Sequence, residues 1–390
     1  MFTETAPPAP VVTPFSRKNP FPSRLLTRRK LDGPGSEKET FHYEFSLEQS
    51  GLSFEVGDSL GVFPANAPEL VEEILTLLEF TGEEEVTGAS GESIPVRSAL
   101  LRDRTITTPS RQFVQMVAER IPAARFLLEY CDLKQRAKLD SYLWGRHVVD
   151  FLIEYPELRN KISPSELVTA LSKLQPRLYS LASSLKRYPE AAHLLAANVG
   201  FVSYGRSRKG VCTSFMCERI DEATRIPVFI HTAKHFRLPA DSAAPIIMIG
   251  VGTGLAPYRA YLQEREAVGA TGRNWLFFGE QRRAANFYHE KEFAEYTSSG
   301  VLTRFDTAFS RDQSQKIYVQ HRLRELGREI WSWLEEGAYL YLCGDAERMA
   351  PDVDAALQDI AEQQGAMSKE EAAEYMARLR AEKRYRRDVY

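Results

Sequence analysis

A glycine-rich turn at residues 246–257 constrains the fold more strongly than any other feature of the sequence. The segment reads IIMIGVGTGLAP, and Gly250, Gly252 and Gly254 separate an apolar strand-like run from a helix-like run. Glycines let backbone N–H groups approach a phosphate closely, and the N-terminus of the following helix adds a favourable dipole. The turn therefore predicts a pyrophosphate site, with a merely tight strand-to-helix turn as the alternative. Leu255 replaces the third glycine of the usual dinucleotide motif, so the turn alone does not identify the ligand.

The sequence after Ala244 alternates between apolar strand-like runs and amphipathic helix-like runs. The strand-like runs are 245–250, 274–281, 302–309 and 338–345. The helix-like runs are 259–268, 289–297, 319–334 and 349–364. Strands that are apolar on both faces are typical of a parallel sheet covered by helices on each side. We therefore predict a doubly wound parallel-sheet domain over residues 241–390.

The first half of the chain contains two kinds of pattern. Residues 41–63 alternate in short apolar stretches separated by turn residues, which is typical of antiparallel strands. Residues 65–174 place apolar side chains three and four positions apart, as amphipathic helices do. Strand-like text returns after this block, so we predict one antiparallel β-barrel formed by residues 15–64 and 175–240, with the helical block 65–174 inserted into it. The predicted fold class is α/β and multi-domain.

Composition excludes several classes of function. The chain has 50 Lys and Arg against 53 Asp and Glu, a formal net charge of −3, so we expect no nucleic-acid partner. No apolar run approaches the roughly 20 residues of a membrane-spanning helix, so we expect no membrane insertion. Residues 1–14 are rich in Pro, Thr and Ala and lack the features of a secretory signal. We interpret this segment as a flexible leader and expect a cytoplasmic protein.

The cysteines indicate neither a disulfide framework nor a metal site. The four cysteines form no C-x-x-C pair, and no Cys/His cluster has the spacing of metal ligands. These residues are Cys131, Cys212, Cys217 and Cys343. We expect no bound metal ion.

A second ligand signal lies at 309–320, just after a predicted strand. Ser310, Arg311, Lys316 and Tyr318 cluster there, and guanidinium, ammonium and hydroxyl groups together suit a dianionic phosphate such as the ribose 2′-phosphate of NADP. Taken alone, a solvated loop with routine charges is the better interpretation. The pairing with the glycine turn favours the nucleotide site.

Two weaker signals lie in the predicted barrel. RLYS at 177–180 offers a guanidinium, an aromatic ring and a hydroxyl, which a flavin needs for its pyrophosphate, its ring system and its N5 atom. GVCTSF at 210–215 supplies a second glycine turn, with Thr213 as a donor. An ordinary strand and an ordinary turn are the alternatives.

Two further residues lie near the C-terminus. Cys343 ends a predicted strand, at the edge where open α/β sheets bind ligands, although a buried structural cysteine is commoner. Taken alone, the tail that ends in Tyr390 would be interpreted as frayed.

These motifs, in this order, resemble the diflavin reductase branch of the ferredoxin–NADP reductase superfamily. The ordered motifs are RLYS, GVCTS, GVGTGLAP, FSRDQSQKIYVQ and YLCGD, followed by a terminal aromatic residue after DV. SEKE, VGDSLGVFPAN, HFRLPA, NWLFFGE and RYRRDVY extend the resemblance over about 19–390. Within the branch, the sequence is most similar to the flavoprotein (α) subunits of NADPH–sulfite reductases.

The resemblance implies FAD and NADPH as cofactors and assigns residues to each. The residues implied for FAD are Arg177, Leu178, Tyr179, Ser180, Asn198, Val199, Gly200, Tyr204, Gly210, Val211, Cys212, Thr213 and Tyr390. Those implied for NADPH are Gly252, Thr253, Gly254, Ser310, Arg311, Lys316, Tyr318, Gln320 and Asp352, with Arg29 as a further phosphate contact. The resemblance also implies a catalytic set of Ser180, Cys343 and Asp388, with Tyr390 covering the flavin ring.

Two departures from the family pattern stand out. Diflavin reductases carry an FMN-binding, flavodoxin-like domain ahead of this region, and we expect no such domain because the match begins almost at the N-terminus. Gly145 stands where related members have an arginine that contacts FAD, and only the neighbouring Arg146 is a candidate substitute.

The resemblance implies an NADPH-dependent FAD flavoprotein whose electron acceptor is a redox protein. The expected acceptor is a sulfite reductase haem/iron–sulfur subunit, reached directly or through a separate flavodoxin or ferredoxin. One alternative is a general NADPH–flavodoxin or NADPH–ferredoxin reductase. A non-catalytic flavin-binding scaffold is a third hypothesis, and the presence of Ser180, Cys343 and Asp388 argues against it.

Overall fold

The structure is a computed structural model that describes residues 13–390. Most of the predicted leader, residues 1–12 of 1–14, lies outside the described residues. Within the described range, Thr13 Oγ1 donates a hydrogen bond to the carbonyl of Ser50 (2.7 Å). None of the helices in that range has the length and apolar character needed to cross a lipid bilayer.

The chain divides into two compact units. The larger unit contains the described residues up to Gly61, together with Leu178–Ala197 and Asp221–Tyr390, and the helical unit contains Val62–Arg177 and Asn198–Ile220. Residues 198–220 belong to the helical unit. From the sequence pattern, we predicted that this segment forms part of the barrel. The domain limits drawn from the sequence remain predictions.

The larger unit begins with two antiparallel sheets, in which β2 is largely exposed and β3 is largely buried. One sheet has the strand order β1-β11-β4-β7 and the other β2-β3-β8. Strand β3 pairs antiparallel with β2 and with β8. The strands are β1 (Phe21–Ser23), β2 (Leu25–Lys30), β3 (Thr40–Ser46), β4 (Ser59–Val62), β7 (Arg177–Ser180), β8 (Ala191–Ala197) and β11 (Ile226–His231).

The larger unit continues into a five-stranded parallel sheet of order β14-β13-β12-β15-β16. The strands are β12 (Ile246–Val251), β13 (Asn274–Glu280), β14 (Arg304–Phe309), β15 (Tyr339–Gly344) and β16 (Tyr385–Val389). All seven residues of β13 are buried, as a parallel strand covered on both faces requires. The predicted fold class is therefore confirmed, with antiparallel sheets, a helical insert and a parallel sheet.

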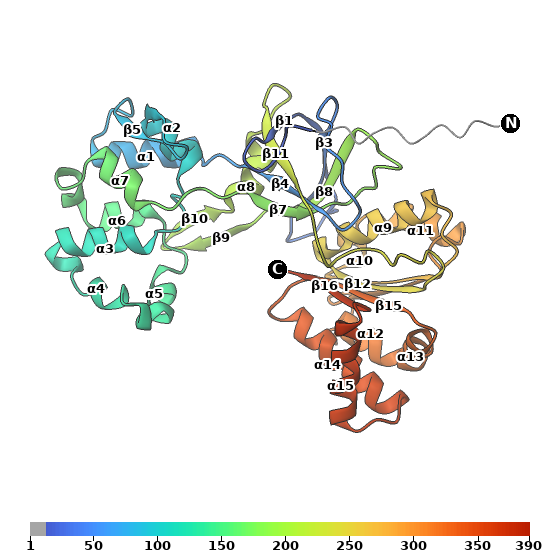
Figure 1. The fold of residues 1–390 in the computed structure, drawn as a ribbon. Coiled ribbons are helices and arrows are strands. Elements are labelled where there is room, and N and C mark those ends of the chain that lie inside the picture. Colours follow the sequence, from blue (N-terminus) through green and yellow to red (C-terminus); the bar gives the residue numbers. More distant parts are fainter. Residues whose placement is uncertain (1–12) are drawn as a thin grey trace. The chain divides into compact units, whose positions relative to one another are not determined.

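Helices cover both faces of the parallel sheet (Figure 1). Ile246 and Met248 pack with the helices on one face, and the alternate residues Ile247 and Ile249 pack with those on the other. Helices α9 (Ala256–Ala267) and α11 (Glu290–Ser298) belong to the first face. The second face is covered by α12 (Val319–Glu325), α13 (Gly327–Glu335), α14 (Met349–Gln364) and α15 (Lys369–Ala381). This part of the chain also contains two short helices, η6 (Gly252–Leu255) and α10 (Arg283–Asn286).

The single helix predicted over 319–334 is wrong in one respect, because the structure has two helices there. Helix α12 ends at Glu325, and α13 begins at Gly327. A Cβ atom at Gly327 would lie 3.2 Å from Cγ1 of Ile360 on α14. The glycine thus permits close packing of α13 on α14 and weakens the helix at the point where it breaks.

The helical unit has its own apolar core, built by the amphipathic pattern of 65–174. Its α-helices are α1 (Pro68–Leu78), α2 (Val96–Ser98), α3 (Arg111–Arg120), α4 (Leu127–Tyr130), α5 (Arg136–Leu143), α6 (Val148–Glu154), α7 (Pro164–Ala170) and α8 (Val211–Ser214). Its 3₁₀ turns are η2 (Pro122–Ala124), η3 (Leu133–Gln135) and η4 (Pro156–Asn160), and its π-helical turns are η1 (Ala99–Asp103) and η5 (Phe215–Arg219). Two small hairpins complete it, β5 (Glu85–Thr87) with β6 (Ser93–Pro95) and β9 (Gly200–Ser203) with β10 (Arg206–Lys209).

Helix caps explain several of the boundaries in the helical unit. Ser110 precedes α3, and its hydroxyl accepts a hydrogen bond from the backbone N–H of Phe113 (2.9 Å). Ser163 and Glu166 form a capping box at the start of α7. Such caps satisfy N–H groups that have no partner inside the helix, so the chain begins a helix at these serines.

Candidate functional site

The end of β15 and the C-terminal strand β16 bring together three of the predicted catalytic residues. Cys343 and Asp388 are register partners in the parallel ladder. Ser180, at the end of β7, donates a hydrogen bond from Oγ to Oδ2 of Asp388 (2.6 Å). Sγ of Cys343 lies 3.9 Å from the same oxygen. Residues separated by more than 200 positions in the sequence thus form one polar cluster.

Cys343 is held in its neutral thiol form. Its side chain is fully buried, and burial raises the pKa of the thiol well above its usual value. The negative charge of Asp388 adds to this increase in pKa. A thiol with a raised pKa is a poor nucleophile, so the cluster favours a packing role for the sulfur over covalent chemistry.

The glycine turn lies beside this cluster. A Cβ atom at Gly254 would lie 2.2 Å from the carbonyl oxygen of Cys343, so only glycine fits there. Gly252 has a φ of 59°, in the left-handed region that glycine tolerates. Between them, Thr253 Oγ1 shares a hydrogen bond of 3.0 Å with the hydroxyl of Tyr390. The C-terminal residue is fixed by its backbone as well, because its N–H donates to the carbonyl of Gly344 (3.1 Å).

A cavity of about 420 Å³ opens in the larger unit. Six of the residues predicted for NADPH line it, namely Ser310, Arg311, Lys316, Tyr318, Gln320 and Asp352. Gln320 Nε2 donates to Oδ2 of Asp352 (2.9 Å), which orders one wall. Cationic and hydroxyl groups gathered in one cavity fit a phosphorylated nucleotide, because they supply the charge and the donors that a dianionic phosphate requires.

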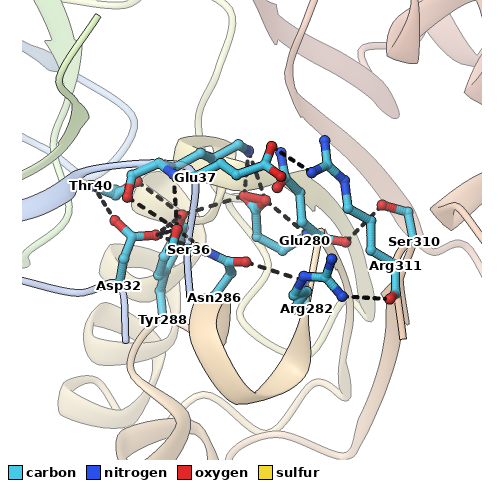
Figure 2. Close-up of polar contacts among 12 residues, drawn as sticks. Asp32, Ser36, Glu37, Thr40, Glu280, Arg282, Asn286, Tyr288, Ser310 and Arg311 are labelled. Carbon is cyan, nitrogen blue, oxygen red and sulfur yellow. Dashed lines mark hydrogen bonds and ion pairs between the residues drawn. The ribbon is translucent and has the colours of Figure 1, made fainter. Parts of the chain in front are cut away.

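The cavity also contains side chains that sequence reasoning missed. Lys38, Glu280, Asp345 and Arg348 line it together with the predicted residues. Lys38 Nζ lies 2.7 Å and 2.8 Å from the two carboxylate oxygens of Glu280, whose own side chain is buried. The signal available in the sequence was the SEKE motif that contains Lys38, although nothing in that motif indicates the strand it contacts. Figure 2 shows Glu280 beside Ser310 and Arg311.

Arg29 is exposed on β2 and is not among the residues that line this cavity. Its backbone pairs with His42 across the β2–β3 ladder. The proposed phosphate contact of Arg29 therefore stays a prediction, and Lys38 is the cation from this part of the chain that reaches the cavity.

The residues predicted for FAD between 198 and 213 lie in the helical unit, around the β9–β10 hairpin and α8. The N–H of Gly210 donates to the carbonyl of Val199 (2.9 Å), and the N–H of Val199 donates to Oγ1 of Thr213 (3.3 Å). These contacts draw the segment 198–200 onto the start of α8, so two motifs that looked weak separately form one structure. Arg177 also belongs to this unit, whereas Leu178, Tyr179 and Ser180 belong to the larger unit.

The position of the missing arginine, Gly145, is closed to any side chain. Gly145 has a φ of 72°, and a Cβ atom there would lie 2.2 Å from Oγ of Ser203. The guanidinium of Arg146 lies 4.4 Å from the ring centroids of both Tyr142 and Tyr204, and it pairs with Glu154 (2.7 Å). Arg146 therefore supports Tyr204, one of the residues predicted for FAD, through a cation–π contact.

The predicted FAD residues fit a large, partly apolar cofactor. In the larger unit, Leu178 is 49% exposed and Tyr390 is 64% exposed. In the helical unit, Val199 is 49% exposed and Tyr204 is 51% exposed. Within each unit taken by itself, exposed apolar and aromatic side chains at predicted contact positions suit a ligand with flat rings such as FAD.

A separate buried cluster contains possible metal ligands. Ligand atoms of His42, Glu44 and His193 lie within 4.8 Å of one another, a grouping that the spacing of the sequence did not reveal. Nη1 of Arg259 lies 3.2 Å from Nδ1 of His193 and pairs through its Nε with Glu292 (2.7 Å). A guanidinium so close opposes the binding of a cation. Burial lowers the pKa of both histidines, so they are neutral at neutral pH.

Comparison with known proteins gives two family matches. Residues 13–215, just over half of the chain, match the family described as FAD binding domain, and residues 248–355 match the oxidoreductase NAD-binding domain. The first match covers the helical block and the antiparallel strands other than β11. The second covers the parallel sheet from β12 to the start of α14, and β16 lies beyond it. Both matches agree with the locations of the motifs described above.

Three bacterial relatives share the name sulfite reductase (NADPH) flavoprotein alpha-component. The protein of Bacillus subtilis is 42% identical over 99% of this chain, and that alignment covers 64% of the relative. The proteins of Vibrio vulnificus and Mannheimia succiniciproducens are each 40% identical over 96% of this chain, covering 60% and 62% of their own lengths. The chain thus spans roughly three fifths of the relatives that it matches.

Proposed function

Because the chain belongs to the FAD-binding-domain family, we propose that it is an NADPH-dependent oxidoreductase that delivers electrons to a haem/iron–sulfur subunit of sulfite reductase. Delivery is direct or passes through a separate electron carrier. The observation that carries the proposal is the cluster of Ser180, Cys343 and Asp388 beside the glycine turn, in the same unit as the cationic cavity. The name shared by the relatives supports the choice of acceptor.

The cofactors carry the electrons, and the protein residues hold the cofactors in place. When bound, FAD accepts a hydride from NADPH and releases the electrons one at a time to the acceptor. In the proposed assignment, Tyr179, Ser180, Tyr204 and the 210–213 turn hold FAD. The residues of the 420 Å³ cavity hold the phosphates of NADPH.

Each residue of the catalytic cluster has a defined physical task. The carboxylate of Asp388 accepts a hydrogen bond from Ser180 and thereby fixes the direction of that hydroxyl. The same carboxylate favours positive charge that develops on the nicotinamide as the hydride leaves. The buried thiol of Cys343 fills the adjacent space without adding charge. The cluster therefore positions groups and stabilises charge, with no covalent step.

The direct test is to reconstitute the reaction with purified components. The protein loaded with FAD is expected to lose its flavin absorbance when NADPH is added without oxygen. Addition of a sulfite reductase haem/iron–sulfur subunit, with and without a flavodoxin, is then expected to give NADPH-dependent formation of sulfide. Flavin reduction that never leads to sulfide under either condition would contradict the proposed acceptor but not the reductase activity.

Neutralising the phosphate-binding cations should affect NADPH far more than NADH. In the double variant Arg311→Gln, Lys316→Gln, we expect the KM for NADPH to rise at least about 100-fold, because two charge-assisted hydrogen bonds contribute roughly 1.5–3 kcal/mol each, or about 3 kcal/mol together at the lower limit. The KM for NADH should change little, since NADH has no 2′-phosphate. Steady-state kinetics with both nucleotides checks this expectation. Equal increases for both would mean that the 2′-phosphate binds elsewhere.

Removing the ring of Tyr390 should improve the use of NADH relative to NADPH. The ring is expected to occupy the place where the nicotinamide must stack, and displacing it penalises a weakly bound nucleotide most. We expect Tyr390→Ala to raise the ratio of kcat/KM for NADH to that for NADPH about tenfold, a change that corresponds to roughly one aromatic stacking contact. Tyr390→Phe is the matched control, because it keeps the ring and loses only the hydrogen bond to Thr253. A ratio unchanged in Tyr390→Ala would refute this role.

A further inference from the structure

The loop that joins β2 to β3 reaches the nucleotide cavity and is fixed by buried polar groups. Asp32 and Asn286 are both buried, and Nδ2 of Asn286 donates to Oδ1 of Asp32 (2.8 Å) and to Oγ of Ser36 (2.9 Å). Ser36 Oγ in turn accepts a hydrogen bond from the backbone N–H of Lys38 (2.9 Å). Figure 2 shows this network converging below the loop. The backbone on both sides of Glu37 is therefore anchored.

Glu37 extends from this anchored loop to the phosphate-binding cations. Its Oε2 accepts a hydrogen bond from Nη1 of Arg311 at 2.7 Å. Arg311 is itself positioned by Arg282, whose Nη1 donates to the carbonyl of Arg311 (3.0 Å). The hydrogen bond from Arg311, together with its charge, lowers the pKa of the Glu37 carboxyl, so this group is anionic at neutral pH. In this structure, therefore, a carboxylate is already paired with the guanidinium that is predicted to bind phosphate.

The neighbouring lysine does not neutralise this anion. Lys38 Nζ binds both carboxylate oxygens of Glu280, at 2.7 Å and 2.8 Å. Glu37 and Lys38 therefore have separate partners at the ends of two different strands. Lys38 contacts Glu280, the last residue of β13, and Glu37 contacts Arg311, which follows β14. A phosphate approaching Arg311 meets the negative charge of Glu37 without a free cation from the same loop.

We infer that Glu37 sets the affinity for the 2′-phosphate by competing with it for Arg311. The inference rests on the proposed function, since it takes Arg311 as a ligand of that phosphate. A carboxylate and a dianionic phosphate repel each other, so binding of the phosphate must displace Glu37 from the guanidinium. NADH has no such group and leaves the pair intact. Glu37 therefore lowers the preference for NADPH below the value that the cations alone would give.

Direct binding of adenosine 2′,5′-bisphosphate tests the inference without turnover. Adenosine 5′-diphosphate serves as the probe without the 2′-phosphate, and both are titrated by calorimetry into the full chain loaded with FAD. Glu37→Gln is expected to tighten binding of the bisphosphate about two- to fivefold at low salt, the range for an exposed ion pair, with no effect on the diphosphate. Raising the ionic strength to 0.5 M should shrink the difference, because salt screens exposed charges.

Glu39→Gln is the matched control. Glu39 lies on the same loop, is similarly exposed and pairs with Lys30 at 3.2 Å, away from the cavity. The Glu39→Gln variant should therefore bind both probes with unchanged affinity. In the Glu37→Gln variant, unchanged or weaker binding of the bisphosphate would overturn the inference, since weaker binding would mean that Glu37 holds Arg311 ready for its ligand.

Arg311→Gln separates failure of the inference from failure of the proposed function. If Arg311 binds the 2′-phosphate, this variant loses affinity for the bisphosphate and keeps affinity for the diphosphate. Retained affinity for the bisphosphate would overturn both the phosphate site and the competition. A loss of affinity in Arg311→Gln with no gain in Glu37→Gln would overturn the competition alone.

Discussion

Replacing Asp388 with asparagine is expected to slow reduction of the bound flavin by NADPH about 100-fold, the usual cost of losing one electrostatic contact to a transition state. Asparagine keeps the shape of the side chain and can still accept the hydrogen bond from Ser180. It removes only the negative charge. Stopped-flow absorbance of the flavin measures the rate, and the concentration dependence gives the affinity for NADPH, which should change little.

Two further variants show whether charge or orientation carries this effect. Ser180→Ala leaves the carboxylate charged and removes its hydroxyl partner, so a smaller decrease in rate is expected. Asp354→Asn is the control, because Asp354 also contacts β16, through Tyr385 (2.6 Å) and Arg387 (3.0 Å). It should leave the rate unchanged. A wild-type rate in Asp388→Asn would contradict the role of the carboxylate.

The parallel sheet and its ligand edge could be predicted because the signals are local. Each buried strand of this sheet is one apolar run, and each motif directly follows its strand, so the carboxyl edge collects the motifs whatever the details of packing. Cys343 and Asp388 meet because their strands are neighbours in register. Strand β16 reads YRRDV, which is not an apolar run, so the sequence pattern did not predict this fifth strand. Of the turn glycines, Gly252 is favoured by its backbone conformation and Gly254 by close approach to the carbonyl of Cys343, and in both cases the glycine itself is visible in the sequence.

The missed parts of the site depend on contacts between distant segments. Lys38 and Glu280 are separated by 242 positions, and neither residue type indicates its partner. The loop that contains Lys38 is fixed by Asp32 and Asn286, a pair that is also remote in sequence. Periodicity cannot encode such contacts. Periodicity indicates which face of a helix or strand is buried. Which cation lines the cavity depends on how the loop between β2 and β3 folds against the rest of the unit.

The grouping of residues 198–220 with the helices illustrates a similar limit. Strand β9 pairs there with β10 in a hairpin through Tyr204 and Gly205, which have φ values of 50° and 68°. Two positive φ values in a two-residue turn match the tight hairpin geometry that favours glycine. Strand patterns do not reveal which unit a hairpin joins. That choice depends on partners such as Asp150 of α6, which pairs with the buried Arg208 of β10 at 2.7 Å.

The second large effect expected is a loss of stability in mild acid, because the protein buries histidines in their neutral form. His42 and His193 are each 1% exposed, and their rings lie 5.0 Å apart. Burial, together with the nearby charge of Arg259, lowers the pKa of His42 to about 2 and that of His193 to about 3. The other ionisable groups that influence the pair are Arg29, Glu44, His289 and Glu292.

The direction of the pH dependence follows from these values. Unfolded histidines have a pKa of about 6.5, so below that pH the unfolded chain binds protons that the folded chain does not. Stability should therefore fall as the pH decreases through 6.5 and continue to fall toward the folded pKa values. At pH 5 the two histidines together account for about 4 kcal/mol, from roughly 1.4 kcal/mol per pKa unit for each. This loss is a large part of the 5–15 kcal/mol that typically stabilises a domain.

Urea unfolding at pH 7.5, 6 and 5, followed by tryptophan fluorescence, measures this effect. The wild-type midpoint is expected to fall steeply below pH 6.5, whereas the double variant His42→Gln, His193→Gln should start lower and fall less, because glutamine does not titrate. If the double variant does not fold, the imidazole NMR signals of the wild-type protein provide a second measurement, and they should show no protonation of these rings at pH 5. Rings that titrate near pH 6.5, or a midpoint constant between pH 7.5 and 5, would contradict the assignment, because neutral buried histidines cannot leave stability independent of pH in this range.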